Sequence, residues 1–191
     1  YNFEIKKLSQ KIVNDFNIKN GPIYFQFLIG DQGIKVNEIA CRIGGAYEGD
    51  FMPILTGVDI LKMMVQLAAG NEVNIEALEN YELENNKQHL SSQLFFARSG
   101  EIKKMTASSE IEKMPGVLKA GFNYDLGEII PDIENATARA GYFIVIADSK
   151  NELRERVSYV YDKLKILDER GNNLVLREIG ENFKSLFNSG V

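Results

Sequence analysis

Hydrophobic and polar residues alternate along two short stretches near the start of the chain. Tyr24–Ile29 and Ile34–Cys41 are rich in aromatic and β-branched residues, which favour a partly buried strand. Between them, Asp31-Gln32-Gly33 has the composition of a three-residue hairpin loop that ends on a left-handed glycine. The pattern therefore predicts an antiparallel hairpin.

The expected loop sets Gln26 directly opposite Glu38. Because side chains alternate along a strand, Ala40 should share their face, whereas Asn37 and Ile39 should point to the other one. A carboxylate and a carboxamide oxygen would then meet on one side of a small sheet, and magnesium takes oxygen ligands of this kind. The alternative is a half-exposed hairpin whose polar residues simply face water.

Two segments around the hairpin have helical periodicity. Residues 2–18 predict an amphipathic helix that packs on the hairpin, and a second helix follows Thr56-Gly-Val-Asp59, which has the form of a capping box. The apolar positions of the two helices are Ile5, Leu8, Ile12 and Phe16, and then Leu61, Met64, Val65 and Ala68.

Residues 71–88 are acidic and rich in asparagine, and within them we expect a linker at 76–88. We accordingly divide the chain into a first domain at 1–75, this linker, a second domain at 89–177 and a terminal helix at 178–191. Phe183, Leu186 and Phe187 would anchor that helix.

The second domain has the pattern of a small α+β domain. Strands are expected at 89–98, 102–106, 117–124 and 141–147, with a last one at 174–176. A helix capped by Ser149-x-x-Glu152 carries an apolar stripe, and we expect it to cover one face of a strand meander.

Composition excludes several classes of function. The chain has 191 residues and a net charge of −5 without a basic stripe, which argues against nucleic acid as a partner. His89 is the only histidine, so a histidine triad or a zinc site is not expected. Cys41 is the only cysteine, so it has no intrachain disulfide partner; we expect it to be buried and the compartment to be reducing.

Targeting signals are also lacking in the sequence. No apolar run approaches the roughly 20 residues that cross a bilayer, and no signal peptide precedes the first helix. The chain begins with Tyr1 inside a helical pattern, so we expect it to be part of a longer, cytoplasmic protein.

The stretch from Tyr24 to Gly45 resembles the C-terminal half of the nucleotide domain in ATP-grasp enzymes. In that family one strand carries a Gln, Glu or Asp metal ligand, and a following strand has the pattern E-x-N-x-R, often with glycines after it. The matching residues here are Gln26 and Glu38 for the metal, Arg42 for the arginine, Gly44 and Gly45 for the glycines, and TGVDIL at Thr56–Leu61 for the next helix.

One position departs from the family pattern. Ala40 stands where the family usually has an asparagine ligand, and Asn37 should not replace it because it is expected on the opposite face. Glu48 or Asp50 could supply the missing oxygen. Alternatively, these two carboxylates form a surface ion pair with Arg42.

The second half resembles the C-terminal domain that follows the ATP-grasp core in amino-acid ligases and carboxylase-like relatives. The matching features are Gly100–Ile102, the EIEKMPGV stretch, Arg139–Tyr142 and the capped helix after Asp148. Arg139 could hold a substrate carboxylate, or it could fix its loop through an ion pair with Glu134 or Asp132.

The resemblance implies an α+β fold: the C-terminal portion of an ATP-grasp fold, an antiparallel sheet with packed helices, followed by a small α+β domain. It implies an ATP- and magnesium-dependent ligase that joins a small-molecule carboxylate to an amine through an acyl phosphate. Gln26 and Glu38 would then hold the metal, Arg42 would contact the phosphoryl group, and the Gly44-Gly45 turn would bring backbone amides to anionic groups.

Alternatives remain within and beyond this resemblance. A carbamoyl-phosphate synthase-like or phosphoribosylglycinamide synthetase-like enzyme keeps the fold but changes the substrate, and a degenerate module would have lost catalysis. In the family, the adenine pocket, the phosphate-binding lysines and the lid precede the metal strands. We therefore expect the remaining N-terminal part of the same enzyme as a partner, with a homodimer left open, and neither tight ATP binding nor turnover by these residues alone.

Overall fold

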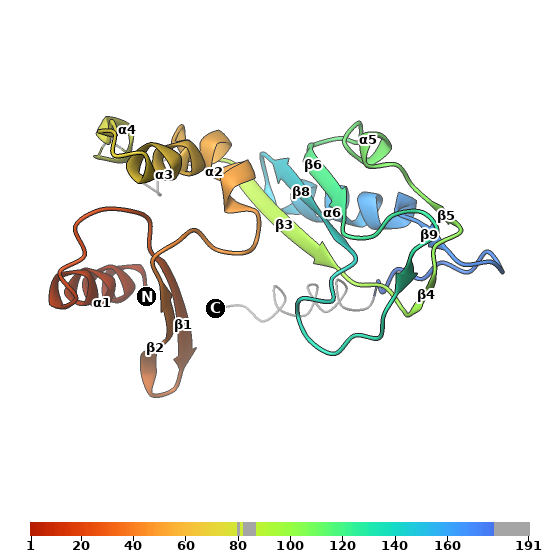
Figure 1. Ribbon diagram of the computed structural model, residues 1–191, viewed down its shortest axis with the longest axis horizontal. Helices are drawn as coiled ribbons and strands as arrows, with labels where there is room; N and C mark the ends of the chain where they lie inside the picture. Colours follow the sequence, from red (N-terminus) through yellow and green to blue (C-terminus); the bar gives the residue numbers. More distant parts are fainter. Residues whose placement is uncertain (80, 82–86, 178–191) are drawn as a thin grey trace. The chain divides into compact units, whose positions relative to one another are not determined.

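Two units make up the chain, Tyr1–Glu82 and Leu83–Val191 (Figure 1). The computed structural model describes residues 1–79, 81 and 87–177. The division between the units falls within the linker expected at 76–88. The helix predicted at 178–191 lies outside the described residues.

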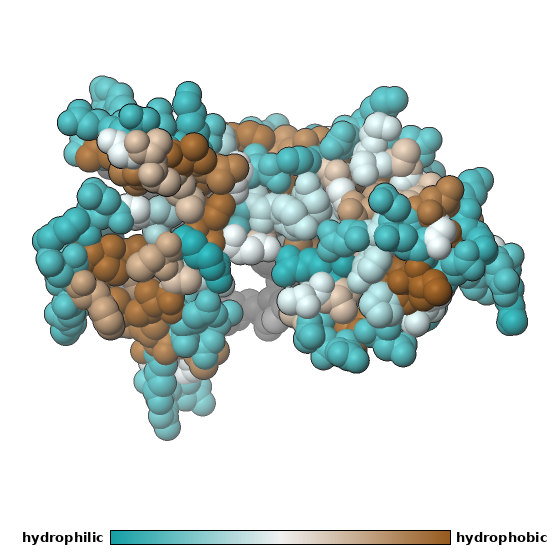
Figure 2. All heavy atoms as spheres, viewed as in Figure 1, coloured by the Kyte–Doolittle hydropathy of each residue, from teal (hydrophilic) through white to brown (hydrophobic). Residues whose placement is uncertain are grey.

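The first unit consists of a helix, a two-stranded hairpin and further short helices. Its elements are α1 (Asn2–Asp15), β1 (Tyr24–Gly30), β2 (Gly33–Ala40), α2 (Glu48–Thr56), α3 (Ile60–Ala68) and α4 (Glu76–Glu79). Figure 2 shows apolar surface over α1 and the hairpin and over α3.

The helix α1 follows its predicted stripe over most of its length. Ile5, Leu8 and Ile12 are half-buried, as the spacing predicted. Phe16 is not part of the buried face: it lies just beyond the end of the helix and is 72% exposed. The chain turns there, because Asn17 adopts a φ of 53° in the left-handed region.

The hairpin β1–β2 has a tighter turn than the sequence predicted. Gly30 pairs with Gly33, so only two residues form the turn, and Gly33 takes the left-handed conformation with φ 87°. Gln26 nevertheless pairs with Glu38, as predicted, because β2 contains one extra residue between Val36 and Glu38. This β-bulge shifts the register by one position.

The hairpin has an apolar and a more polar face, because successive side chains of a strand point to opposite sides. On one face, three apolar residues of β1 pair with three of β2: Phe25 with Ile39, Phe27 with Val36, and Ile29 with Ile34. The rings of Phe25 and Phe27 stack with their centroids 5.7 Å apart. Gln26 and Glu38 lie on the opposite face.

The helices α2 and α3 differ from the sequence prediction at their junction. Thr56 does not cap α3; it ends α2, where its hydroxyl donates to the Met52 carbonyl and accepts from the Val58 amide. Asp59, rather than Thr56, is the N-cap of α3 and accepts from the Lys62 amide. In the described part of the chain no helix could cross a membrane by itself; α2 and α3 meet that criterion only as a pair, bent by 112°.

The second unit contains a three-stranded sheet with smaller strand pairs beside it. Its elements are β3 (His89–Phe95), β4 (Gly100–Glu101), β5 (Lys104–Met105), α5 (Ser108–Ile111), β6 (Val117–Phe122), β7 (Ile129–Ile130), β8 (Gly141–Ala147), α6 (Lys150–Lys163) and β9 (Ile166–Leu167). The order β3-β8-β6 is antiparallel but is not the meander that we predicted, because the last strand in sequence inserts between the other two.

The helix α6 covers one face of this sheet and contacts β3 and β8. Ser149 caps α6 as predicted, since its hydroxyl accepts from the Glu152 amide at 3.2 Å. Side chains packed between α6 and the sheet are buried, among them Phe95, Phe143 and Val160. The segment predicted as a last strand at 174–176 forms a single bridge, from Val175 to Ala97.

A buried polar chain links this helix to the sheet. The Tyr161 hydroxyl donates to Gln93 Oε1 at 3.2 Å, and Gln93 Nε2 donates to Ser91 Oγ at 2.6 Å. Burial raises the pKa of Tyr161 to about 12. The chain satisfies polar groups inside the core and so fixes α6 on β3.

Candidate functional site

The polar face of the hairpin brings together the two residues predicted to hold a metal. Gln26 on β1 and Glu38 on β2 are direct cross-strand partners, and both side chains are exposed. Directly opposed residues on one face of an antiparallel pair have their Cβ atoms about 5 Å apart. A carboxylate and a carboxamide therefore lie within reach of one small cation.

Asn37, the extra residue of the bulge, also reaches this face. Its Nδ2 donates a hydrogen bond to Gln26 Oε1. The prediction that Asn37 points to the opposite face is therefore wrong, because the bulge interrupts the alternation on which it rested. A sequence signal for the bulge does exist: the apolar positions of β2 are Ile34, Val36 and Ile39, so their spacing changes from two to three.

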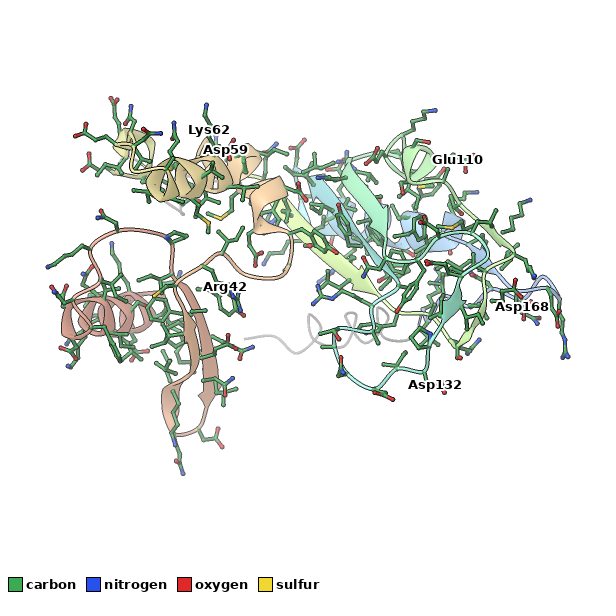
Figure 3. All side chains as sticks on the ribbon, in the orientation of Figure 1. Arg42, Asp59, Lys62, Glu110, Asp132 and Asp168 are labelled. Carbon is green, nitrogen blue, oxygen red and sulfur yellow. The ribbon has the colours of Figure 1, made fainter. Side chains whose placement is uncertain are left out.

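Arg42 is the second residue after β2, and its guanidinium lies beside Glu38 at the same face (Figure 3). Its NH2 group is 3.5 Å from Glu38 Oε1, and its NH1 group donates to the Ile43 carbonyl at 2.8 Å. The guanidinium carbon lies 5.7 Å from the centre of the Tyr24 ring. From the sequence we considered an ion pair of Arg42 with Glu48 or Asp50. In the structure the carboxylate beside Arg42 is that of Glu38.

Glu48 is the first residue of α2, and its carboxylate binds the backbone of the loop between β2 and α2. Its Oε2 accepts from the Ala46 amide at 3.0 Å, and its Oε1 lies only 2.0 Å from where a Cβ on Gly44 would be. Gly44 is therefore needed for the approach of this carboxylate. A Cβ on Gly45 would meet no atom within 4 Å. The roles of Glu48 in substrate binding and of both glycines in cofactor binding stay predictions.

The structure also locates Arg139 and Cys41, two further residues for which the sequence analysis made a prediction. Arg139 lies in the second unit, where its Nε donates to the Ala136 carbonyl at 3.2 Å; its contact with a substrate carboxylate stays a prediction. Cys41 is exposed, so the prediction that it is buried is wrong. The reason is that β2 ends at Ala40, and the strand alternation no longer applies to the next residue.

The donor set of the polar face fits magnesium better than a softer metal. Within the described residues, no three His, Cys, Asp or Glu side chains gather around one point. Glu38 instead contributes one carboxylate beside the carboxamides of Gln26 and Asn37, all oxygen-bearing groups. Magnesium is commonly held by one or two carboxylates together with substrate phosphates, so this sparse set is compatible with it.

Part of the second unit is similar to a known protein family. Residues 93–167 match the family described as L-amino acid ligase C-terminal domain 2. The matched segment contains β8 and α6, which contribute Phe143, Val145, Val160 and Tyr161 to the core of that unit.

Similarity to individual proteins extends over both units. The L-arginine-specific L-amino acid ligase of Bacillus subtilis is 22% identical over 158 residues, which are 82% of this chain and 37% of that protein. An L-amino acid ligase from Bacillus licheniformis has a similar structure, with a TM-score of 0.70, 18% identity, and coverage of 86% of this chain and 40% of that one. Phosphoribosylglycinamide synthetase from Anaerococcus prevotii gives a TM-score of 0.68 at 15% identity, over 84% and 40% of the two chains.

These similarities confirm the resemblance to the ATP-grasp superfamily that the sequence suggested, and within the second unit the similarity at 93–167 is to the L-amino acid ligase C-terminal domain 2 family. The α+β fold matches that of the C-terminal region of such ligases over most of the chain. The chain spans less than half the length of the relatives that it matches.

Proposed function

We propose that this chain carries the metal-binding hairpin and the C-terminal domain of an ATP-dependent ligase that joins the carboxylate of an amino acid to an amine. The observation that carries the proposal is the opposition of Gln26 and Glu38 on one exposed face, with the Arg42 guanidinium 3.5 Å from the carboxylate. The family match at 93–167 favours the amino-acid ligase branch.

Each residue of the site would have a distinct task. Bound magnesium–ATP would supply the phosphoryl group that activates the carboxylate. Glu38 and Gln26 would hold the ion through their oxygens, whereas Arg42, paired with Glu38 and stacked near Tyr24, is oriented by these neighbours. Its fork of donors suits the oxygens of a phosphoryl group or an acyl phosphate.

The first unit supports the expectation that the rest of the enzyme completes it. Among its described residues only Val58 is buried, and large apolar side chains such as Leu28, Ile29 and Val65 are 49–63% exposed. Apolar surface of this kind marks an interaction site in a soluble protein. We infer that the remaining N-terminal part of the enzyme covers it and supplies the adenine pocket.

The phosphoribosylglycinamide synthetase branch is the second candidate, because its TM-score of 0.68 nearly equals the 0.70 of the amino-acid ligase. The fold therefore leaves the substrate open, and the family match decides our preference. In either branch the small-molecule substrates are a carboxylate and an amine, with ATP and magnesium as cofactors.

A substrate screen with the complete enzyme tests the proposal. Release of ADP from ATP should depend on magnesium and on a pair of L-amino acids, and not on phosphoribosylamine with glycine. Glu38→Gln should lower the rate by at least about a hundredfold, because the charged ligand that would hold the magnesium ion against the phosphates is lost.

A matched control exists on the same hairpin. Asp31→Asn also removes one carboxylate, but from the exposed turn, and should keep the wild-type rate. Absence of ADP release with every amino acid, or equal rates for wild type and Glu38→Gln, would refute the proposal and favour a non-catalytic module.

A further inference from the structure

The extra residue in β2 has an effect beyond the register of the hairpin. Phe27 pairs with Val36 and Gln26 pairs with Glu38, so Asn37 has no residue opposite it on β1. A bulge of this kind redirects a side chain locally, and bulges are frequent next to functional sites. Here the redirected side chain is a carboxamide that lies against the predicted metal ligand Gln26.

The hydrogen bond between the two carboxamides shows how close they are. Asn37 Nδ2 donates to Gln26 Oε1, and both side chains are exposed to solvent. A half-turn of the Asn37 carboxamide would exchange its Nδ2 for Oδ1 at the same place. Two carboxamide oxygens that face each other repel unless a cation lies between them, and a cation is what this face is expected to bind.

Compared with the ATP-grasp pattern, the candidate metal site lacks one oxygen ligand, the one that an asparagine at position 40 would supply. Ala40 has no side-chain donor, while Glu48 already accepts from the Ala46 amide in the following loop. Asn37 is the neighbour of Glu38 in sequence and contacts Gln26 in space. Its carboxamide is thus available to the same ion as both predicted ligands.

We infer that Asn37 is the third oxygen ligand of the divalent-cation site and replaces the side chain that Ala40 lacks. The inference rests on the proposed function, because it assumes that Gln26 and Glu38 hold the cation. It adds that the β-bulge, rather than the regular strand position, supplies the last ligand.

Binding of Mn²⁺ alone to the complete enzyme, with the free ion measured by electron paramagnetic resonance, tests this inference without reference to activity. Asn37→Ala should weaken Mn²⁺ binding at least about tenfold. Asn37→Asp should bind as tightly as wild type or more tightly, because it presents an oxygen with a negative charge. Gln32→Ala removes a carboxamide from the turn of the same hairpin and should leave binding unchanged.

The aspartate variant separates a ligand from a mere hydrogen-bond donor. It is close to isosteric with asparagine, so it preserves the bulge even where alanine disturbs it, and far-ultraviolet circular dichroism checks the fold of each variant. If both Asn37 variants weaken binding, Asn37 acts only as the N–H donor to Gln26, and the inference is overturned.

Comparison with the two predicted ligands shows which proposal fails. If Asn37→Ala binds like wild type while Gln26→Ala and Glu38→Ala lose affinity, the role of Asn37 is refuted and the proposed metal site stands. If all three variants bind Mn²⁺ like wild type, the metal site itself is refuted, and the inference falls with it.

Discussion

Glu38 is the residue on which the candidate site depends most. It faces a carboxamide across the hairpin and a guanidinium 3.5 Å away, and its side chain is 49% exposed. An exposed ion pair of this kind contributes little to stability, about 0–1 kcal/mol. The placement of Glu38 therefore matters more for the charge that it presents to a ligand than for holding the fold together.

Tyr161 allows a stability prediction at the scale of a single side chain. Tyr161→Phe leaves Gln93 Oε1 without its donor in the core, so the free energy of unfolding should fall by about 1–2 kcal/mol at neutral pH. Urea titrations of wild type and variant at pH 8, followed by circular dichroism, measure this difference. Equal stability would contradict the structural role of the buried hydroxyl.

The same residue sets a pH dependence whose sign follows from its raised pKa. The pKa is 10.0 in the unfolded chain and about 12 in the folded one, so the folded protein retains the proton more strongly. This contribution to stability is complete below pH 10 and is lost as the pH rises to 12. Over that interval the stability of wild type should fall more steeply than that of Tyr161→Phe, by up to about 1.4 kcal/mol for each pH unit.

At the scale of single elements, the hairpin shows what local sequence can and cannot predict. Alternation and the turn composition predicted the two strands, and Gln26 does pair with Glu38. The sequence predicts this pair from a three-residue loop, but the structure has a two-residue turn. The bulge at Asn37 adds one residue to β2, so Gln26 is opposite Glu38 in both cases. The apolar faces decide between the two, since the bulge keeps Val36 opposite Phe27.

The junction of α2 and α3 shows a similar limit. Thr56 and Asp59 have the spacing of a capping box, but only Asp59 caps α3. The preceding helix α2 was not predicted, in part because Pro53 lies inside it. Thr56 consequently bonds to the last turn of α2 instead.

The loop after β2 gives a prediction for its glycines. Gly44→Ala would place a Cβ 2.0 Å from Glu48 Oε1 and 3.0 Å from the Tyr24 ring, so the carboxylate must leave the Ala46 amide. We expect a loss of about 1–2 kcal/mol in the stability of the first unit, measured as a lower melting temperature of the complete enzyme. Gly45→Ala should leave the melting temperature unchanged, because no atom lies within 4 Å of the added Cβ.

A double-mutant cycle identifies the cause of that loss. In a Glu48→Ala background the carboxylate is gone, so Gly44→Ala should cost much less than it does in wild type. Equal costs in the two backgrounds would mean that Glu48 does not explain the glycine at position 44.

At the scale of the whole molecule, the two units differ in how many of their apolar side chains are buried. The second has a core of fully buried side chains between α6 and its sheet, including Phe95, Phe143 and Leu164. The described part of the first has a single buried hydrophobic residue, Val58. This difference agrees with the chain's coverage of at most 40% of the similar ligases and synthetase, and it is why we propose activity only for the complete enzyme.

The α+β class and the capped helix α6 followed from sequence patterns, whereas the strand order did not. Local residues determine that 117–122 and 141–147 are extended, but the insertion of β8 between β3 and β6 depends on contacts between distant segments.

The position of the divalent ion tests the central claim most directly. Crystals of the complete enzyme grown with Mn²⁺ and ADP give an anomalous difference map that locates manganese independently of any assumed ligand. We predict a peak between the side chains of Gln26 and Glu38, on the face that Asn37 also reaches. A well-ordered manganese peak bound to the nucleotide but away from this hairpin face would contradict the assignment of the metal site.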